Sequence, residues 1–317
     1  MHDTEDAPGT GHEHGATRHH HPHGAPDPSG HPRLGIVGAG RAGTALGLAF
    51  SRAGWPVAAI ASRDAARRAR FTQLVPTARP VEAPADLVDE VDIVLLAVPD
   101  DVIASIAARS RLYSGQAIVH ISGALAASAL DAARAAGTSA GSFHPLVAIA
   151  DPERAVADFR DATVAIEGDE SLMPILADLA RAIGANPVQL PPGGKPAYHA
   201  AAMLAAGGFI GLLDAIAEVA RGAGLDEAGA VAIYAPLIRQ SLANAEALGI
   251  DAALTGPLAR GDRGTVAAHL AALRTLAPGA VGLYAAVAHR EIDIAERRRR
   301  LTSDHAADLR RLLSEAG

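Results

Sequence analysis

The stretch 34–43, LGIVGAGRAG, places the strongest constraint on what this chain can fold into. A short apolar run, expected to be a strand, leads directly into the pattern G-x-G-x-x-G. The residues that follow, TALGLAFSRAG, have apolar side chains at helical spacing and stop at Gly54. Strand, glycine pattern and helix in this order form the context that a dinucleotide-binding fold requires.

Each glycine of the pattern has a physical reason. Gly38 permits a tight turn, Gly40 lets the backbone approach a pyrophosphate, and Gly43 lets the helix pack closely on the strand. Arg41 and Ala42 fall in the first turn of the helix, whose free N–H groups and dipole favour a phosphate. We therefore predict that these five residues bind the cofactor.

Composition excludes several other classes of protein. The 317 residues carry a net charge of −7 with no basic face in the folded part, so we expect no nucleic-acid partner. There are no cysteines, which excludes disulfides and thiolate chemistry and agrees with a cytoplasmic enzyme. We see neither an uninterrupted apolar run long enough to span a membrane nor the apolar core of a signal peptide.

Residues 1–31 are rich in His, Gly, Pro and Asp and show no hydrophobic period, so we expect a disordered tail. The tail contains eight of the fourteen histidines. Loose binding of zinc or nickel is one interpretation; a compositionally biased tail or a tag remnant is the other, and we favour it. We predict no metal site.

From Pro32 to residue 190 strands and helices alternate, which predicts an α/β fold with a Rossmann-type, doubly wound parallel sheet. The expected helices include 65–74, 124–136 and 172–183. The expected strands are 34–37, 57–61, 79–81, 92–98, 116–121, 139–143, 163–166 and 187–190.

A turn cluster, PPGG at 191–194, ends this first domain. Residues 195–317 show no convincing strand and predict an all-helical domain for substrate binding and dimerisation. Its first helix, 197–223, is apolar almost all round, so we expect it to be buried at the centre of a bundle or at a subunit interface. We expect a homodimer formed through this domain. The other expected helices are 226–248, 265–276, 281–299 and 303–314.

The residues after the second strand indicate which nucleotide is bound. Ser62 and Arg63 stand where NAD enzymes place an acidic residue and NADP enzymes an arginine. A guanidinium pairs well with the additional phosphate of NADP. Asp64 would favour NAD if the register were shifted by one residue, and Arg67 and Arg68 could simply form a solvated helix face. We predict NADP(H).

Other candidate residues lie at the carboxyl ends of the expected strands, where α/β sheets bind ligands. Val98 and Pro99 end one strand, and Ser122 and Gly123 form a turn predicted to lie against the nicotinamide. His144, before Pro145, either contacts the ligand or only fixes the turn. His120 lies inside its strand and fits a packed core residue better than a catalytic one.

The segment KPAYH, 195–199, is the second candidate cluster. Lys195 is the only lysine of the chain and stands at the mouth of the apolar helix, while His199 lies four residues on, on the same helix face. A desolvated ammonium has a lowered pKa and can give a proton to a carbonyl oxygen that receives hydride. We predict Lys195, His199 and His144 as catalytic residues; an ordinary surface lysine is the alternative.

The third candidate cluster is LTGPLARGD, 254–262, a Gly- and Pro-rich stretch between helices. Turn chemistry alone explains Gly, Pro and Asp there. A loop with Thr255 and Arg260 can also close over an anionic substrate, so we predict that both residues bind substrate.

Taken together, these segments resemble a family of bacterial proteins that join a Rossmann-like domain to a domain of unknown function, DUF2520. The matching segments are GIVGAGRAGTALG, DIVLLAVPDDVI, HISGAL, SFHPL, KPAYHAAA and LTGPLARGD. The family is similar to ketopantoate reductase and pyrroline-5-carboxylate reductase. The resemblance implies that Lys195 matches the lysine that opens the equivalent helix in ketopantoate reductases. An asparagine that the family commonly has further along this helix is missing, because residues 205–208 are AAGG.

Three functions follow as hypotheses. The first is NADPH-dependent reduction of a small 2-oxo acid, with ketopantoate as the best single guess. The second is reduction of an imine, as in pyrroline-5-carboxylate reductase. The third is a catalytically silent NADP(H)-binding regulator, which the missing asparagine motivates.

Overall fold

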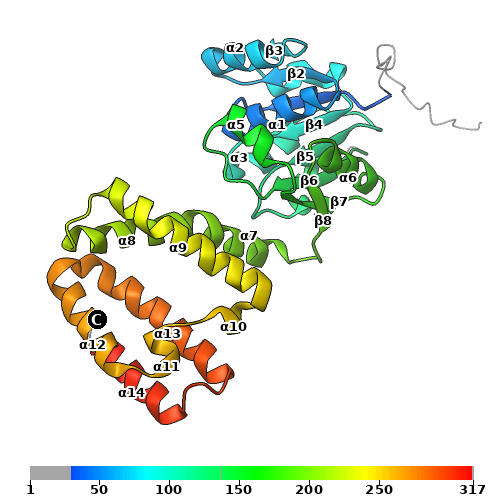
Figure 1. Ribbon diagram of the computed structural model, residues 1–317. Coiled ribbons are helices and arrows are strands. Elements are labelled where there is room, and N and C mark those ends of the chain that lie inside the picture. Colours follow the sequence, from blue (N-terminus) through cyan, green and yellow to red (C-terminus); the bar gives the residue numbers. More distant parts are fainter. Residues whose placement is uncertain (1–29, 136, 316–317) are drawn as a thin grey trace, which may run out of the picture. The chain divides into compact units, whose positions relative to one another are not determined.

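The computed structural model describes residues 30–135 and 137–315; most of the expected His-rich tail lies outside these residues. The chain divides into two compact units, residues 1–200 and 201–317. Each unit is described by itself below (Figure 1).

The first unit is built on one eight-stranded sheet with the strand order β3-β2-β1-β4-β5-β6-β7-β8. This order, with β1 at the point where the chain reverses direction across the sheet, confirms the predicted Rossmann-type α/β fold. The strands are β1 Leu34–Val37, β2 Val57–Ala61, β3 Arg79–Val81, β4 Ile93–Leu96, β5 Ala117–His120, β6 Ser139–Pro145, β7 Thr163–Gly168 and β8 Asn186–Gln189.

The sheet is parallel except between β6 and β7, which pair antiparallel with Pro145 opposite Val164. The sequence predicts a parallel sheet, and this one antiparallel pair departs from that prediction. The connection from β6 to β7 contains only the short helix α5, Pro152–Asp158, which packs against α1. Because β7 starts beside the end of β6, the chain returns antiparallel without crossing the sheet.

Helices cover both faces of the sheet (Figure 1). One core lies between the sheet and the side chains of α1, α2, α5 and α6; the other lies between the sheet and η1, α3, η2 and α4. The expected helix 124–136 is two short pieces, η2 and α4. The remaining bounds are α1 Arg41–Arg52, α2 Ala65–Leu74, η1 Pro84–Glu90, α3 Asp100–Arg109, η2 Ala127–Leu130, α4 Asp131–Arg134 and α6 Met173–Ala182.

The turn between β1 and α1 has the geometry that its glycines permit. Gly38 has a φ of +108°, and a Cβ there would lie 2.2 Å from the Ala97 carbonyl oxygen. A Cβ on Gly43 would lie 2.0 Å from the Gly38 carbonyl oxygen. Gly40 differs, since a Cβ there would meet nothing within 4 Å. Two glycines therefore allow the backbone to close, while the third faces open space.

The second unit is helical, as predicted. The apolar helix expected at 197–223 is a continuous helical run made of α7, η3 and α8. It begins in the first unit, and η3, with the residues LAAGG, is a π-helical turn within it. The expected loop at 254–262 includes a short helix, α11. The bounds are α7 Lys195–Met203, η3 Leu204–Gly208, α8 Phe209–Gly222, α9 Glu227–Leu248, α10 Ile250–Ala253, α11 Pro257–Arg260, α12 Arg263–Leu276, η4 Pro278–Ala280, α13 Val281–Arg297 and α14 Ser303–Ser314.

Within a single chain the apolar helix is not buried, so it does not lie at the centre of a bundle formed by this chain's own helices. Only 6% of its most apolar 18-residue window is buried. The core of this unit instead lies among α11, α12, α13 and α14, around residues such as Val266 and Ile292. The large apolar side chains left exposed on η3, α8 and α9 include Leu204, Ile210, Ile233, Leu237 and Leu242.

By length and composition alone, the run Lys195–Gly222 can cross a membrane: it has 28 residues and a mean hydropathy of 1.8 in that window. The sequence analysis does not predict a span here because the uninterrupted apolar run, residues 200–213, is only 14 residues long, between His199 and Asp214. A single helix of this kind is weak evidence for a membrane span, because a helix of a soluble protein can pass the same test.

We predict that Gly38→Ala lowers the free energy of unfolding by at least about 2 kcal/mol, because the new Cβ meets a backbone oxygen at a positive φ. Gly40→Ala is the matched control and should change it by less than about 0.5 kcal/mol. Urea unfolding followed by circular dichroism measures both. Equal stability of the two variants would contradict this account of the turn.

Candidate functional site

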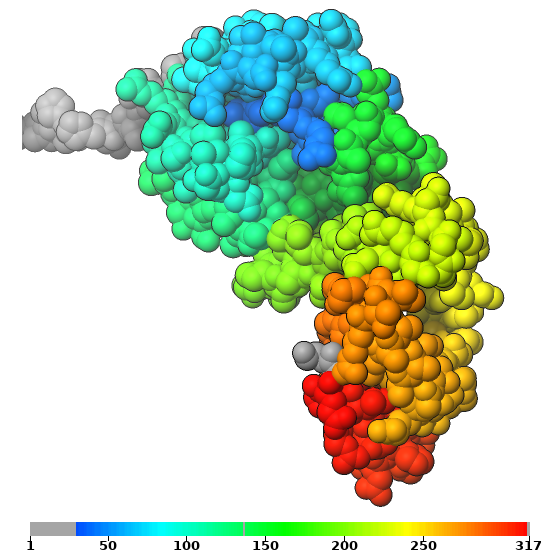
Figure 2. All heavy atoms as spheres, turned by 90° about the vertical axis from the view of Figure 1, so that its left-hand side faces the viewer, coloured from blue at the N-terminus to red at the C-terminus, as the bar shows by residue number. Residues whose placement is uncertain are grey.

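A cleft of about 1450 Å³ opens at the carboxyl ends of the first strands. Figure 2 shows this unit with the dark blue residues near its start set back between lighter blue and cyan segments. Most residues predicted to bind a cofactor line the cleft, whereas Gly43 packs beneath it and the Ser122–Gly123 turn is not part of its lining. The predicted residues in the lining are Gly38, Gly40, Arg41, Ala42, Ser62, Arg63, Val98 and Pro99.

The first turn of α1 is prepared for an anion. Gly40 is the N-cap residue and makes no side-chain cap, and this first turn contains no acidic residue. Its free N–H groups and the positive end of the helix dipole are therefore open to a negatively charged ligand. Arg41, the first residue of the helix, is exposed and lines the same cleft.

The end of β2 favours an additional phosphate over a ribose hydroxyl. The Asp64 carboxylate caps α2: it accepts the Arg67 N–H at 3.1 Å and pairs with the Arg67 guanidinium at 3.2 Å. Arg68 donates to the Ser62 carbonyl oxygen. Among the described residues, Arg63 has no recorded ion pair. Because Asp64 is engaged by its own helix, Arg63 is the group at this strand end left to contact a ligand.

A second group of polar side chains gathers around Lys195, at the ends of β5 and β6. Lys195 is 2% exposed, and its Nζ donates to the Ser122 carbonyl oxygen at 2.7 Å and to the Ser142 hydroxyl. Burial lowers the pKa of Lys195 to about 8, while the Glu167 and Asp100 carboxylates act to raise it. The ammonium therefore ties two strand ends together and titrates close to neutral pH.

Ser122 organises the turn that Lys195 holds. Its hydroxyl donates to the Asp100 carboxylate at 2.8 Å and accepts the N–H groups of Ala124, at 3.2 Å, and Leu125, at 3.0 Å. Asp100 is the first residue of α3, which starts at the end of β4. The ends of β4 and β5 are therefore joined through one hydroxyl group.

His120 is fully buried, and backbone groups provide partners for both of its ring nitrogens. Its Nε2 lies 3.1 Å from the Ala126 carbonyl oxygen, and its Nδ1 accepts the Ser122 N–H at 3.2 Å. Burial lowers the pKa of His120 to about 4, and repulsion by Lys195 contributes. A neutral ring that donates from Nε2 satisfies both contacts, in agreement with the preferred interpretation of this residue as part of the core.

His144 presents a free ring nitrogen to the site. Its Nδ1 lies 3.1 Å from the Ile121 carbonyl oxygen, which can only accept, so Nδ1 carries the hydrogen. Burial lowers the pKa of His144, and repulsion by Lys195 and His199 contributes. The ring is therefore mainly neutral at pH 7, with an unprotonated Nε2.

His199 and Gly123 lie close to His144 Nε2. A Cβ on Gly123 would lie 2.3 Å from His199 Nδ1 and 2.7 Å from His144 Nε2. The rings of His144 and His199 are 5.6 Å apart and nearly perpendicular. His199 Nδ1 and the Tyr198 hydroxyl are buried without a hydrogen-bond partner among the described residues. The structure thus brings together Lys195, His199, His144, Ser122 and Gly123.

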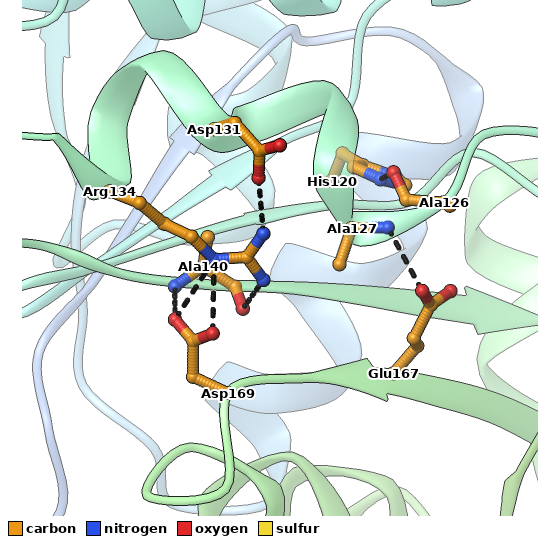
Figure 3. A network of polar contacts seen from close by, with 8 residues as sticks. All are labelled: His120, Ala126, Ala127, Asp131, Arg134, Ala140, Glu167 and Asp169. Carbon is orange, nitrogen blue, oxygen red and sulfur yellow. Dashed lines mark hydrogen bonds and ion pairs between the residues drawn. The ribbon is translucent and has the colours of Figure 1, made fainter. Parts of the chain in front are cut away.

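A further network fixes the neighbouring strands (Figure 3). The Arg134 Nε donates to Asp169 at 3.0 Å, and Asp169 accepts the Ala140 N–H at 2.7 Å. On β7, the Glu167 carboxylate accepts the Ala127 N–H at 3.3 Å. The network connects α4 and η2 to β6 and β7, and it keeps one of the carboxylates that influence Lys195 in place.

The segment 254–262 belongs to the second unit, and local structure explains part of it. Asp262 caps α12 by accepting the Thr265 N–H at 3.0 Å, and Gly256 and Gly261 have φ values of +107° and +72°. Thr255 and Arg260 are exposed, and neither caps a helix nor adopts a positive φ. Their predicted contact with substrate stays a prediction.

Four polar residues of the Lys195 group were missed or undervalued in the sequence: Asp100, Ser142, Glu167 and Tyr198. Ser142 alone carried a readable signal, because it lies two residues before His144 on one strand and so on the same face. Asp100 is the first residue of α3, a position at which an acidic residue is common without any role in a site. The place of Glu167 depends on the antiparallel pairing of β7 with β6, which the sequence did not predict.

Two family models match the chain, and the second of them begins inside the first unit and includes β7, α6 and β8. A family model of a Rossmann-like domain matches residues 26–145, and the model of the domain of unknown function DUF2520 matches residues 162–291. A search of curated proteins finds no match.

Solved structures share the fold over most of the chain. A Bacteroides fragilis protein provisionally described as an NADP oxidoreductase has 20% identity and a TM-score of 0.69, with 83% of this chain and 98% of that chain covered. A 1-pyrroline-5-carboxylate reductase from Streptococcus pyogenes has 17% identity and a TM-score of 0.58, with 84% and 98% covered.

A third similar structure is a reductive aminase from Aspergillus terreus in complex with NADPH and ethyl-5-oxohexanoate. It has 15% identity and a TM-score of 0.57, with 90% of this chain and 93% of that chain covered. At such identities the likeness shows the fold. The family models add that one part of the chain, residues 26–145, matches a Rossmann-like domain and that a later part, residues 162–291, matches DUF2520.

Proposed function

We propose that the protein is an NADPH-dependent oxidoreductase that reduces a small carbonyl or imine substrate. The observation that carries this proposal is the cleft at the end of β1, where an uncapped helix N-terminus and Arg63 offer two separate sites for phosphate. The solved structures described as an NADP oxidoreductase and as an NADPH complex support the same cofactor.

The cleft residues have distinct tasks in this proposal. The N–H groups at the start of α1, with Gly38, Gly40, Arg41 and Ala42, hold the pyrophosphate, and Gly43 keeps the helix close to the strand. Ser62 and Arg63 hold the 2′-phosphate, while Val98, Pro99, Ser122 and Gly123 lie on the path toward the nicotinamide. When bound, the reduced nicotinamide supplies the hydride.

Lys195 is the proton source in this proposal. Its pKa of about 8 lets the ammonium give up a proton near neutral pH, as an efficient general acid should. Two of its three N–H bonds are used by Ser122 and Ser142, which leaves one for a substrate atom. His144 and His199 position the substrate beside it.

The leading substrate is a small 2-oxo acid, with ketopantoate as the best single guess and Thr255 and Arg260 as ligands of its carboxylate. The names of two similar structures, a pyrroline-5-carboxylate reductase and a reductive aminase, favour a second candidate, an imine. Oxidation of NADPH with a panel of 2-oxo acids and cyclic imines separates the two. Tight NADPH binding without turnover on the whole panel would instead indicate a silent, regulatory protein.

The exposed apolar residues of α8 and α9 support a homodimer through the helical domain. Ile210, Ile233, Leu237 and Leu242 are each more than half exposed, on helices whose own unit leaves them uncovered. Monomeric soluble proteins rarely expose large contiguous apolar surfaces, and twofold pairing covers the same surface on both copies. We propose a second copy of this chain as the occupant.

The role of Arg63 can be tested by the selectivity for NADPH over NADH. Arg63→Ala should weaken binding of NADPH by about 10- to 100-fold and leave binding of NADH within about threefold, because only NADPH carries the 2′-phosphate. Fluorescence titration of both nucleotides measures the ratio. Arg70→Ala is the control, since Arg70 pairs with Glu153 away from the cleft lining. An equal loss for both nucleotides would contradict the role assigned to Arg63.

Because Lys195 is the only lysine, lysine labelled with ¹³C at Cε gives one side-chain resonance from the chain. We predict that this resonance titrates with a midpoint near pH 8, well below the pKa of an ordinary lysine, because burial disfavours the charged form. Lys195→Arg should remove the resonance and confirms the assignment. A midpoint above pH 10 would rule out Lys195 as a proton source near neutral pH.

The dimer can be tested by the mass of the protein in solution. Light scattering after size exclusion should give twice the mass of one chain, and Ile233→Asp with Leu237→Asp should shift it toward one chain. Val188→Asp is the control, because Val188 is an exposed apolar residue of β8, outside the helical surface. A wild-type protein of one-chain mass, or one extracted only with detergent, would contradict the proposal.

A further inference from the structure

Two imidazole nitrogens, His144 Nε2 and His199 Nδ1, closely approach Gly123. Since the point where a Cβ would stand is 2.3 Å from His199 Nδ1 and 2.7 Å from His144 Nε2, the two nitrogens lie within about 5 Å of each other. A single atom at hydrogen-bond distance, about 2.8 Å, from both nitrogens fits such a separation. Gly123 is buried and has no positive φ, so close approach of the rings explains a glycine here better than backbone conformation does.

Both nitrogens lack a partner that the described part of the chain provides. His144 uses Nδ1 for the Ile121 carbonyl oxygen, which leaves Nε2 as an acceptor. His199 Nδ1 is buried with no hydrogen bond, as is the neighbouring Tyr198 hydroxyl. Buried polar atoms are rarely left unsatisfied in native proteins, so unpartnered atoms that converge on one place point to a ligand group.

We propose that His144 Nε2 and His199 Nδ1 form a subsite for one hydroxyl group of a small ligand. The hydroxyl hydrogen is donated to His144 Nε2, and the hydroxyl oxygen accepts a hydrogen from His199 Nδ1. One acceptor nitrogen and one donor N–H are the complement of an O–H group.

The charges around the pair favour an oxygen over a cationic amine. The Lys195 ammonium is buried in the same cluster and acts on His144 by repulsion, so a second cation there is unfavourable. Asp100 also influences His144, but its carboxylate accepts the Ser122 hydroxyl at 2.8 Å. The Glu167 carboxylate is held by the Ala127 N–H.

The ligand class that follows is a small hydroxy acid or secondary alcohol. That this hydroxyl is the oxygen produced by reduction rests on the proposed reductase function, whereas the subsite itself rests on the two rings and Gly123. Within that function, the subsite favours a 2-oxo acid over an imine, because the reduced product of a 2-oxo acid carries a hydroxyl and that of an imine carries an amine.

Histidine NMR tests the subsite in the full chain without any turnover. The protein is labelled with ¹⁵N histidine and saturated with NADP⁺, and the ring signals of His144 and His199 are assigned from His144→Gln and His199→Phe. Glycolate, lactate and pantoate are the probes; acetate and propionate are controls that lack the hydroxyl. We expect at least one hydroxy acid, and neither control, to shift the signals of both histidines.

Variants then show whether the two rings act together. Gly123→Ala places a Cβ between the nitrogens and should weaken the binding hydroxy acid by at least about tenfold, as should His144→Gln and His199→Phe. His269→Phe is the matched control, because His269 lies on α12 and bonds the Tyr284 hydroxyl at 3.0 Å. Thermal melting checks that each variant is folded.

Three results would overturn the subsite: no shift of either histidine with any of the hydroxy acids, equal shifts with the hydroxyl-free acids, or binding that disappears with EDTA, which would indicate a metal between the rings. NADP⁺ binding is measured on the same samples. Failure of the nucleotide to bind would count against the proposed function, whereas loss of the hydroxyl effect alone would count against the subsite.

Discussion

One buried ammonium connects the parts of the candidate site. Lys195 comes from the first turn of α7 but lies beneath the strand ends, where its Nζ binds the Ser122 carbonyl oxygen and the Ser142 hydroxyl. Burying a charge is costly unless polar groups compensate, and both acceptors and two carboxylates do so here. The position of the Ser122–Gly123 turn, and with it the gap between the two histidines, depends on this contact.

The cleft and the Lys195 group divide the chemistry between them. At the start of α1 and the end of β2, helix N–H groups and a guanidinium are arranged for the phosphates of a nucleotide. Around Lys195, the buried His199 Nδ1 and Tyr198 hydroxyl have no hydrogen-bond partner among the described residues, and we propose that this group of residues binds a hydroxyl group of a small ligand. Both groups of residues lie at the carboxyl edge of one sheet, where α/β proteins bind ligands.

Much of the first unit could be predicted because its signals are local. The glycine turn, the apolar strands and the alternation of strand and helix depend on neighbouring residues, and residues predicted from them to bind a cofactor, such as Gly38 and Arg63, line one cleft. The antiparallel return of β7 and the neighbours of Lys195 could not be predicted in this way. They depend on residues that are far apart in the sequence, such as Lys195 and Ser122, and periodicity contains no information on such pairs.

The exposed apolar helix shows a different limit. A stretch that is apolar all round predicts burial, but it does not indicate whether the cover comes from the same chain or from another. In the second unit the chain itself leaves residues such as Leu204 and Ile210 uncovered. The structure therefore excludes cover by this chain's own helical unit, and cover by a second copy stays a prediction.

A crystal structure of the protein grown with NADP⁺ tests the central claim most directly. The account predicts that the pyrophosphate lies at the N-terminus of α1, that Arg63 contacts the 2′-phosphate, and that the nicotinamide reaches the Ser122–Gly123 turn. A nucleotide bound elsewhere, or no nucleotide at saturating concentration, would contradict the claim that this cleft serves a reductase.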